Sequence, residues 1–202
     1  KMSSAVVAAL TTVGYLIFGV TGYTNQISAL EQQSAPASLT EFSLDEQLRQ
    51  VILRLEPTWS ARGISWQLDL NSVTVVSDEE LLSHVWMNII QNAIKFSPEN
   101  AVIEVRVFAT DTATVEITDH GIGMDDATVK RIFDRFYQAD RSRKQEGVGL
   151  GLCLVKRILD MLGGTVSVDS RPGEGSTFRI HVPFRPKYDE AAHTGEREGK
   201  SP

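Results

Sequence analysis

The amino-acid sequence predicts an α+β fold, a two-layer α/β sandwich in which helices cover one face of a mixed, largely antiparallel sheet. Two long segments, residues 78–96 and 150–162, repeat apolar side chains at helical spacing. Other segments alternate apolar and polar residues on either side of turns, which is typical of β-hairpins: residues 103–107 with 115–117, and 166–168 with 178–182. Helices and hairpins in one chain form the two predicted layers.

Shorter patterns predict the remaining elements. Residues 44–55 have helical apolar spacing, residues 64–70 alternate as a half-buried strand does, and residues 129–136 suit a short helix. The helix over 78–96 stops before Pro98, because proline lacks the N–H that a further turn needs. The helix over 150–162 ends at two glycines, which accept the left-handed conformation common at helix ends.

Composition and charge indicate one globular domain with flanking segments. We divide the chain into an apolar N-terminal segment (1–33), a linker (34–41), a globular domain (42–186) and a polar tail predicted to be disordered (187–202). The net charge of -6, without a basic cluster, argues against nucleic acid as a partner, because phosphate binding requires positive charge. Cys153 is the only cysteine, which excludes an intrachain disulfide.

The N-terminal segment is compatible with two structures. Residues 2–30 contain no charged side chain, and residues 5–20 are mostly apolar, although Gly, Thr and Ser dilute them. A membrane-spanning helix needs roughly 20 predominantly apolar residues. A membrane or interfacial helix and a buried helix of a dimer are therefore both left open.

A polar stripe runs along the helix predicted over 78–96. Asn88, Asn92 and Lys95 recur at positions i, i+4 and i+7, away from the apolar stripe. Amide oxygens are ligands that Mg²⁺ accepts together with phosphate oxygens and water, and a lysine adds positive charge for the phosphates. Taken alone, the stripe is more simply explained as a solvated helix face, so its interpretation depends on the motifs that follow.

Two glycine-containing motifs complete the pattern. Asp119 ends a predicted strand and precedes Gly121 and Gly123, where a flat ligand can approach the backbone and the carboxylate can accept a hydrogen bond from an amine such as that of adenine. Residues 146–152, Glu-Gly-Val-Gly-Leu-Gly-Leu, open the second long helix with backbone N–H groups suited to an anion. Ordinary turns also use glycine, but the three features in this order predict a nucleotide pocket. Residues 139–148 are predicted to form its mobile lid.

Residues 42–184 resemble the ATP-binding catalytic domain of bacterial two-component sensor histidine kinases, within the wider group of gyrase, heat-shock-90 and mismatch-repair ATPases. Five motifs carry the resemblance in the family's order. They are the N box (residues 88–98, NIIQNAIKFSP), the first glycine box (119–123, DHGIG), the F box (133–140, FDRFYQAD), the second glycine box (147–152, GVGLGL) and the last glycine box (173–178, GEGSTF). Three positions depart from the usual pattern: His120, Gln138 and Ser176, where the family often has Asn, Arg and Thr.

The resemblance implies a role for each matched residue. The catalytic residues would be Asn88, Asn92 and Lys95, with Asn88 and Asn92 holding Mg²⁺ and Lys95 contacting phosphate. Asp119 would bind the adenine amino group, and Thr177 would close the base side of the pocket. The implied ATP-binding residues are Asn92, Lys95, Phe96, Asp119, Gly121, Gly123, Tyr137, Gly147, Val148, Gly149, Leu150, Gly151, Leu152 and Thr177.

The implied reaction is transfer of the γ-phosphoryl group of Mg-ATP to a histidine on a dimerisation domain, which then serves a response regulator. Such a domain is cytoplasmic, in some cases as part of an inner-membrane sensor. Hydrolysing relatives place a glutamate base where this chain has Asn88, and an amide cannot take a proton from water, so slow hydrolysis is expected. No histidine precedes His84 here, and none of the four histidines has the context of the family's acceptor. A non-catalytic ATP-binding regulatory module and an anti-sigma-type serine kinase are the alternatives.

Overall fold

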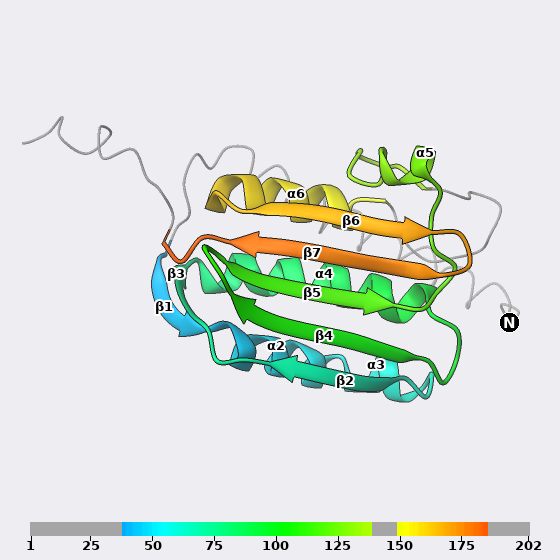
Figure 1. The fold of residues 1–202 in the computed structure, drawn as a ribbon, viewed down its shortest axis with the longest axis horizontal. Helices are drawn as coiled ribbons and strands as arrows, with labels where there is room; N and C mark the ends of the chain where they lie inside the picture. Colours follow the sequence, from blue (N-terminus) through cyan, green and yellow to red (C-terminus); the bar gives the residue numbers. More distant parts are fainter. Residues whose placement is uncertain (1–37, 139–148, 186–202) are drawn as a thin grey trace, which may run out of the picture.

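Helices cover one face of a five-stranded sheet in the computed structural model, which describes residues 38–138 and 149–185 (Figure 1). The predicted two-layer α+β fold is confirmed. The predictions for the N-terminal segment 1–33, the lid 139–148 and the tail 187–202 lie outside the described residues. Among the helices that are described, none is long and apolar enough to span a bilayer.

The elements follow one another in an order close to the predicted one. They are β1 (Thr40–Ser43), α2 (Leu44–Arg54), α3 (Glu56–Ser60), β2 (Ser65–Leu70), β3 (Thr74–Ser77), α4 (Glu79–Phe96), β4 (Val102–Ala109), β5 (Ala113–Asp119), α5 (Asp126–Val129), α6 (Gly151–Leu162), β6 (Thr165–Arg171) and β7 (Gly175–Val182). Both long helices and both hairpins are confirmed. The helix predicted over 129–136 is wrong, because helix α5 ends at Val129 and turns follow it.

The sheet has the strand order β2-β4-β5-β7-β6. β2 pairs with β4 in parallel, whereas the other neighbours are antiparallel, so the sheet is mixed and largely antiparallel as predicted. The pairing of β5 with β7 sets Asp119 opposite Ser176. The last residue of β5 is thereby held beside the start of β7.

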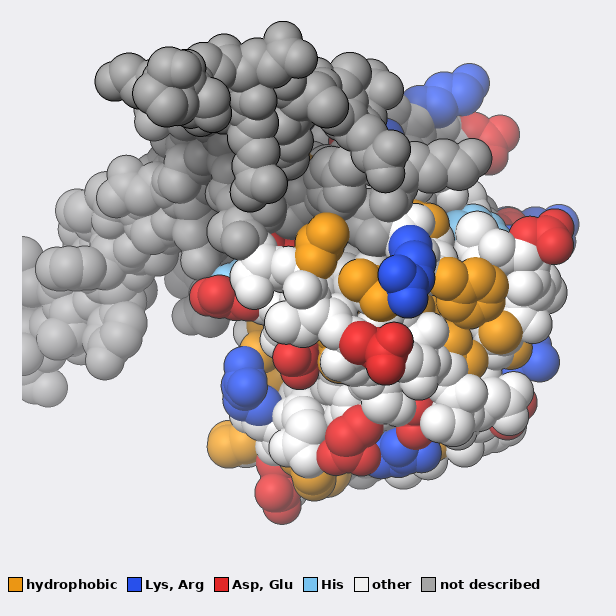
Figure 2. All heavy atoms as spheres, turned by 90° about the vertical axis from the view of Figure 1, so that its left-hand side faces the viewer, with side chains coloured by type: hydrophobic (Ala, Val, Ile, Leu, Met, Phe, Trp, Pro, Cys, Tyr) orange, Lys and Arg blue, Asp and Glu red, His pale blue; other side chains and the backbone are white. Residues whose placement is uncertain are grey.

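A second, two-stranded sheet was not predicted from the sequence. Strand β1 pairs antiparallel with β3, and the Val76 N–H on β3 donates a hydrogen bond of 2.8 Å to the carbonyl of Phe184. The predicted linker 34–41 therefore runs into β1. Figure 2 views the molecule from this end, where acidic, basic and apolar side chains are interspersed in the described part of the surface. The small sheet ties the entry of the domain to its exit after β7.

Helix α4 is the centre of the helical layer. It runs behind the middle of the sheet with α2 and α6 on either side of it (Figure 1). Its apolar stripe, which includes Leu82, Val85, Trp86, Ile89 and Ile90, is fully buried. At its start, Asp78 accepts a capping hydrogen bond of 3.1 Å from the Leu81 N–H. This helix also carries the polar residues predicted to bind Mg²⁺ and phosphate.

A buried glutamine joins α2 to α4. The Gln47 side-chain oxygen accepts a hydrogen bond of 2.7 Å from Trp86 Nε1, and its Nε2 donates one of 2.7 Å to the Glu79 carbonyl. Gln47 and Trp86 are 7% and 0% exposed, so neither group has water as an alternative partner. The pair fixes how α2 lies along α4.

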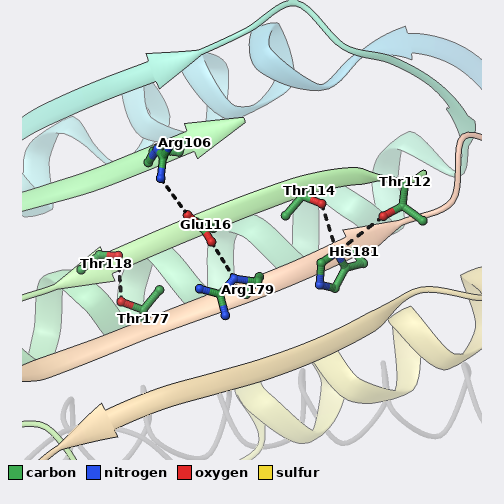
Figure 3. A network of polar contacts seen from close by, with 8 residues as sticks. All are labelled: Arg106, Thr112, Thr114, Glu116, Thr118, Thr177, Arg179 and His181. Atoms are coloured by element: carbon green, nitrogen blue, oxygen red, sulfur yellow. Dashed lines mark hydrogen bonds and ion pairs between the residues drawn. The ribbon is translucent and has the colours of Figure 1, made fainter. Parts of the chain in front are cut away.

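The face of the sheet away from the helices carries polar side chains (Figure 3). Glu116 on β5 lies between two arginines, at 3.3 Å from Arg106 Nη1 and 2.6 Å from Arg179 Nε. Both arginines are about half exposed, and ion pairs of that kind contribute roughly 0–1 kcal/mol. The fold therefore depends on the buried face rather than on this one.

Replacing Gln47 by leucine should lower the free energy of unfolding by about 2 kcal/mol, because Trp86 Nε1 would remain buried without an acceptor. Chemical denaturation monitored by circular dichroism measures this loss. Gln50→Ala is the matched control, since Gln50 lies on the same helix and makes an exposed hydrogen bond to Glu46. Equal effects of the two variants would show that the buried link does not stabilise the fold.

Candidate nucleotide-binding site

Asn88 is buried, which is unexpected for a residue on a polar helix face. It is 6% exposed, and its Nδ2 donates a hydrogen bond of 2.8 Å to the His84 carbonyl. Its Oδ1 lies so close to Gly151 that a Cβ on that glycine would stand 2.5 Å away. The Asn88 amide oxygen thus meets the start of α6, and the solvated-face explanation fails for this residue.

The rest of the N box occupies the last two turns of α4. Asn92 lies one turn beyond Asn88 and is partly exposed, as are Lys95 and Phe96. Lys95 Nζ is 5.0 Å from the centre of the Phe96 ring, within the range of a cation–π contact. The predicted metal and phosphate residues therefore share the C-terminal half of one helix.

Asp119 is a buried carboxylate at the end of β5. It is 5% exposed, and its Oδ1 accepts a hydrogen bond of 2.9 Å from the Gly121 N–H. Burial raises the pKa of Asp119, while backbone N–H groups of Gly121 and Ser176 and the nearby His120 oppose that rise. A carboxylate that is buried and carries a raised pKa is suited to a ligand that donates a hydrogen bond.

The first glycine box packs on the end of α4. A Cβ at Gly121 would lie 2.4 Å from the Phe96 carbonyl oxygen and 2.8 Å from Asp119 Oδ1. The Ile122 N–H donates a hydrogen bond of 3.3 Å to the same carbonyl. Residue 121 must therefore be glycine because the N box and the first glycine box approach each other through their backbones. This requirement holds whether or not a ligand also approaches.

The last glycine box packs against the first. Gly123 has φ +61°, and a Cβ on it would lie 1.8 Å from the Arg171 carbonyl oxygen. Gly175 has φ +98°, and a Cβ on it would lie 2.0 Å from the carbonyl oxygen of Asp119. Both residues combine a left-handed backbone with a contact that leaves no room for a side chain. These contacts fix the turn between β6 and β7 against Asp119, the residue predicted to bind adenine.

The F box contacts the second glycine box. Gly149 has φ +74°, and a Cβ on it would lie 2.5 Å from the Tyr137 carbonyl oxygen. The Phe136 N–H, in a residue with φ +59°, donates a hydrogen bond of 3.0 Å to the Gly149 carbonyl. Leu150 is 2% exposed, and Gly151 and Leu152 begin α6. Gly147 and Val148 lie outside the described residues.

Thr177 does not lie with the other predicted residues. Its hydroxyl is 2.9 Å from that of Thr118, on the sheet face that carries Arg106, Glu116 and Arg179 (Figure 3). The neighbouring Ser176 lies on the Asp119 side instead: it is 8% exposed, and its hydroxyl is 2.9 Å from that of Ser170. Successive strand residues face opposite ways. The alternation of Phe178, Ile180 and Val182 toward the core therefore already indicated that Ser176, and not Thr177, faces inward.

Ser170 is a second residue that sequence reasoning missed. Its hydroxyl donates a hydrogen bond of 2.8 Å to the Gly175 carbonyl and accepts one of 2.9 Å from the Met124 N–H. It thus joins β6, the last glycine box and the loop after β5. No motif or periodicity marked this serine, because its role depends on strand pairing.

The motifs meet at one end of the molecule. The end of α4, the end of β5, the start of α6 and the β6–β7 turn lie together at the right-hand side of Figure 1. Five of the six described glycines in the motifs leave no room for a Cβ because another motif lies against them. Gly121 and Gly151 lie against the N box, Gly149 lies against the F box, and Gly123 and Gly175 hold the first and last glycine boxes together. The arrangement joins a buried carboxylate, amide oxygens, a lysine and the start of a helix.

Comparison with known proteins agrees with this arrangement. Residues 77–186 match the family described as histidine kinase-, DNA gyrase B- and HSP90-like ATPase, and the chain belongs to this family. The chain is 32% identical over 164 residues to the circadian input-output histidine kinase CikA of Synechococcus elongatus, covering 78% of this chain and 22% of CikA. It is 34% identical over 187 residues to the sensor histidine kinase AruS of Pseudomonas aeruginosa, covering 86% of this chain and 18% of AruS.

A solved structure shows the same fold. The structure of full-length ShkA in complex with AMPPNP is 26% identical to the chain with a TM-score of 0.79, over 94% of this chain and 41% of ShkA. The chain thus spans less than half the length of each of these relatives. The predicted class, an ATP-binding catalytic domain of the sensor histidine kinase type, is confirmed.

Gly123→Ala should prevent stable folding or lower the free energy of unfolding by more than about 3 kcal/mol, because the new Cβ would overlap the Arg171 carbonyl. Gly173→Ala is the matched control. Gly173 also has a positive φ, +80°, but apart from its own chain neighbours no residue lies within 4 Å of the position that an alanine methyl group would take. That variant should lose only about 1–2 kcal/mol from backbone strain. Urea denaturation of both variants measures the two losses of stability. Equal losses would show that residue 123 must be glycine only for its backbone conformation and not for its close contact with Arg171.

Asp119→Asn should stabilise the ligand-free protein at about pH 7 while weakening the binding of ATP and ADP. The folded-state pKa of Asp119 lies above its ordinary value of 3.8, so its contribution to stability is present below that value and is lost as the pH rises through the folded pKa. Asparagine removes this loss. Thermal unfolding followed from below pH 3.8 to about pH 7 measures the change in stability. Calorimetry measures the change in nucleotide binding. If Asp119→Asn is no more stable than the wild-type protein near neutral pH, the raised folded-state pKa of Asp119 is contradicted.

Proposed function

We propose that this chain binds Mg-ATP at the junction of α4, β5 and α6 and transfers the γ-phosphoryl group to a histidine of a dimerisation domain. The observation that carries the proposal is the burial of two ligand-binding groups around one junction. Asp119 is a buried carboxylate with a raised pKa, and Asn88 on α4 is a buried amide whose oxygen lies against Gly151 at the start of α6. A charged group is costly to bury unless a partner offsets the loss of water.

The adenine end of the nucleotide would lie at Asp119. Its Oδ1 is held by the Gly121 N–H, which orients the carboxylate, and an exocyclic amine supplies a further hydrogen-bond donor. Gly121 and Gly123 let the backbones of Phe96 and Arg171 pack closely beside this carboxylate, which keeps the adenine end of the site compact. The amine would replace the water that burial removes from this carboxylate.

The phosphate end would lie along α4 and the start of α6. The Nδ2 of Asn88 is used by the His84 carbonyl, so its oxygen is the atom directed at the site, and Asn92 adds a second amide oxygen one turn on. These residues fit a magnesium ion that is also held by phosphate oxygens and water. Such an ion would neutralise part of the phosphate charge. Lys95 supplies a positive charge on the same helix.

The chemistry favours transfer over hydrolysis. The amide of Asn88 has no basic site that could accept a proton from water, and its nitrogen is already a donor to the helix backbone. An imidazole needs no such base, because its neutral nitrogen attacks phosphorus directly. The bond from the γ-phosphorus to the bridging oxygen breaks as the nitrogen–phosphorus bond forms, and ADP leaves with the charge of that oxygen. The chain's contribution is positioning and charge stabilisation.

The comparisons support this direction. The relatives CikA and AruS are named as histidine kinases, and the ShkA structure holds AMPPNP, an ATP analogue. The proposed partners are a dimerisation domain that carries the acceptor histidine and a response regulator that takes the phosphoryl group. Because the reaction consumes ATP, the proposal places the domain in the cytoplasm.

The chain should label a separately supplied, histidine-bearing dimerisation domain when it is incubated with γ-labelled ATP and Mg²⁺. Acid-labile label on that domain supports the proposal. Label on a serine of a partner would indicate an anti-sigma-type kinase, and nucleotide binding without any transfer would indicate a regulatory module. The chain alone should acquire no acid-labile label on His84 or His120.

Asn92→Ala should abolish this transfer and weaken binding of Mg-ATP more than binding of adenosine, because it removes an amide oxygen from the phosphate end only. Asn71→Ala is the control, since Asn71 is exposed in the loop between β2 and β3. Isothermal titration with each ligand measures the difference. Equal losses for adenosine and Mg-ATP would contradict the metal role of Asn92.

A further inference from the structure

The C-terminal turn of α4 has carbonyl groups that its own helix leaves unpaired. The last helical hydrogen bond runs from the Ser97 N–H to the Ala93 carbonyl at 3.2 Å. The next donor in the series would be the N–H of residue 98, but this residue is Pro98 and has none. The N box thus ends its helix in a way that leaves the Ile94 carbonyl without a backbone partner.

Arg62 supplies the donors from a distant part of the chain. Its Nη1 donates hydrogen bonds of 2.5 Å to the Ile94 carbonyl and 2.9 Å to the Lys95 carbonyl, and its Nη2 donates one of 2.7 Å to the Ser97 carbonyl. The planar guanidinium presents several N–H groups at fixed angles, which an ammonium group does not. A positive charge at this end of a helix also interacts favourably with the helix dipole.

The backbone around Arg62 is itself fixed to the turn after α4. The Asn100 N–H donates a hydrogen bond of 2.9 Å to the Arg62 carbonyl. The next residue, Gly63, has φ +65°, and a Cβ on it would lie 2.3 Å from Asn100 Oδ1. The guanidinium therefore acts from an anchored turn rather than from a freely moving one.

The remaining carbonyl of this turn points the other way. The Phe96 carbonyl accepts the hydrogen bond from the Ile122 N–H of the first glycine box. Four consecutive carbonyls, from residue 94 to residue 97, are thus divided between Arg62 on one side and the candidate nucleotide site on the other.

We propose that Arg62 is a positioning residue for nucleotide binding: it holds the last turn of α4 so that Lys95 is presented to the phosphates. The inference rests on the proposed function of the site. Arg62 itself need not touch the nucleotide, because its contacts are to backbone oxygens of the turn that carries Lys95. A small displacement of a binding group is enough to weaken its interaction substantially.

Calorimetry of Mg-ATP binding to the full chain tests this inference. At a temperature where circular dichroism shows every variant fully folded, Arg62→Ala should weaken binding roughly tenfold, and Arg62→Lys should lose less because it retains one donor and the charge. Val182→Ala, a buried change at the far end of β7, controls for lost stability and should keep the wild-type affinity. Arg54→Ala controls for loss of an exposed arginine.

A double-mutant cycle separates positioning from general stabilisation. If Arg62 acts through Lys95, the loss caused by Arg62→Lys should shrink when Lys95 is already alanine. Additive losses, or wild-type affinity in a folded Arg62→Ala variant, would overturn the inference while leaving the proposed function intact. Failure of the wild-type chain to bind Mg-ATP would overturn the proposed function itself, and this inference with it. If Arg62→Ala does not fold, the Arg62→Lys cycle gives the answer.

Discussion

The close approach of backbone segments around the end of α4 is the constraint on which the site depends. Gly121 lies against the Phe96 carbonyl, and Gly151 lies against Asn88, so the helix receives one glycine loop at its C-terminus and another along its side. Any side chain at these positions would separate the elements that carry the predicted nucleotide contacts. The glycine boxes therefore build the site through contacts between protein segments, before any contact with a ligand is considered.

The two ends of α4 are stabilised in different ways. At the start, Asp78 caps the helix, and Gln47 on α2 donates a hydrogen bond to the Glu79 carbonyl and accepts one from Trp86 Nε1. At the end, Pro98 removes a donor and Arg62 supplies replacements. Hydrogen bonds that satisfy buried groups matter most where water has no access, because losing one leaves a desolvated polar atom. The exposed ion pairs on the outer sheet face have no comparable effect.

At Asp119, the stability of the ligand-free fold and the proposed binding of nucleotide have opposite requirements. Its burial raises the pKa of the carboxyl, which means that the charged form destabilises the ligand-free fold near neutral pH. The same burial would strengthen the proposed hydrogen bond to a ligand amine, since water would not compete. The proposed binding role would account for a carboxylate whose burial lowers the stability of the ligand-free fold.

Local patterns in the sequence determined the α+β class, the long helices over 78–96 and 150–162 and the two hairpins, because apolar periodicity depends only on which face of an element is buried. They also located Asn88 and Asp119, which belong to ordered motifs. They did not find β3, whose four residues are too short for a periodic signal, and they extended a helix past Val129 where turns follow. The alternation along β7 indicated Ser176, rather than Thr177, beside Asp119. The burial of Asn88 and the capping of α4 by Arg62 were decided by the tertiary structure. Each of these depends on which segments meet across sequence separations of tens of residues, and no local pattern contains that information.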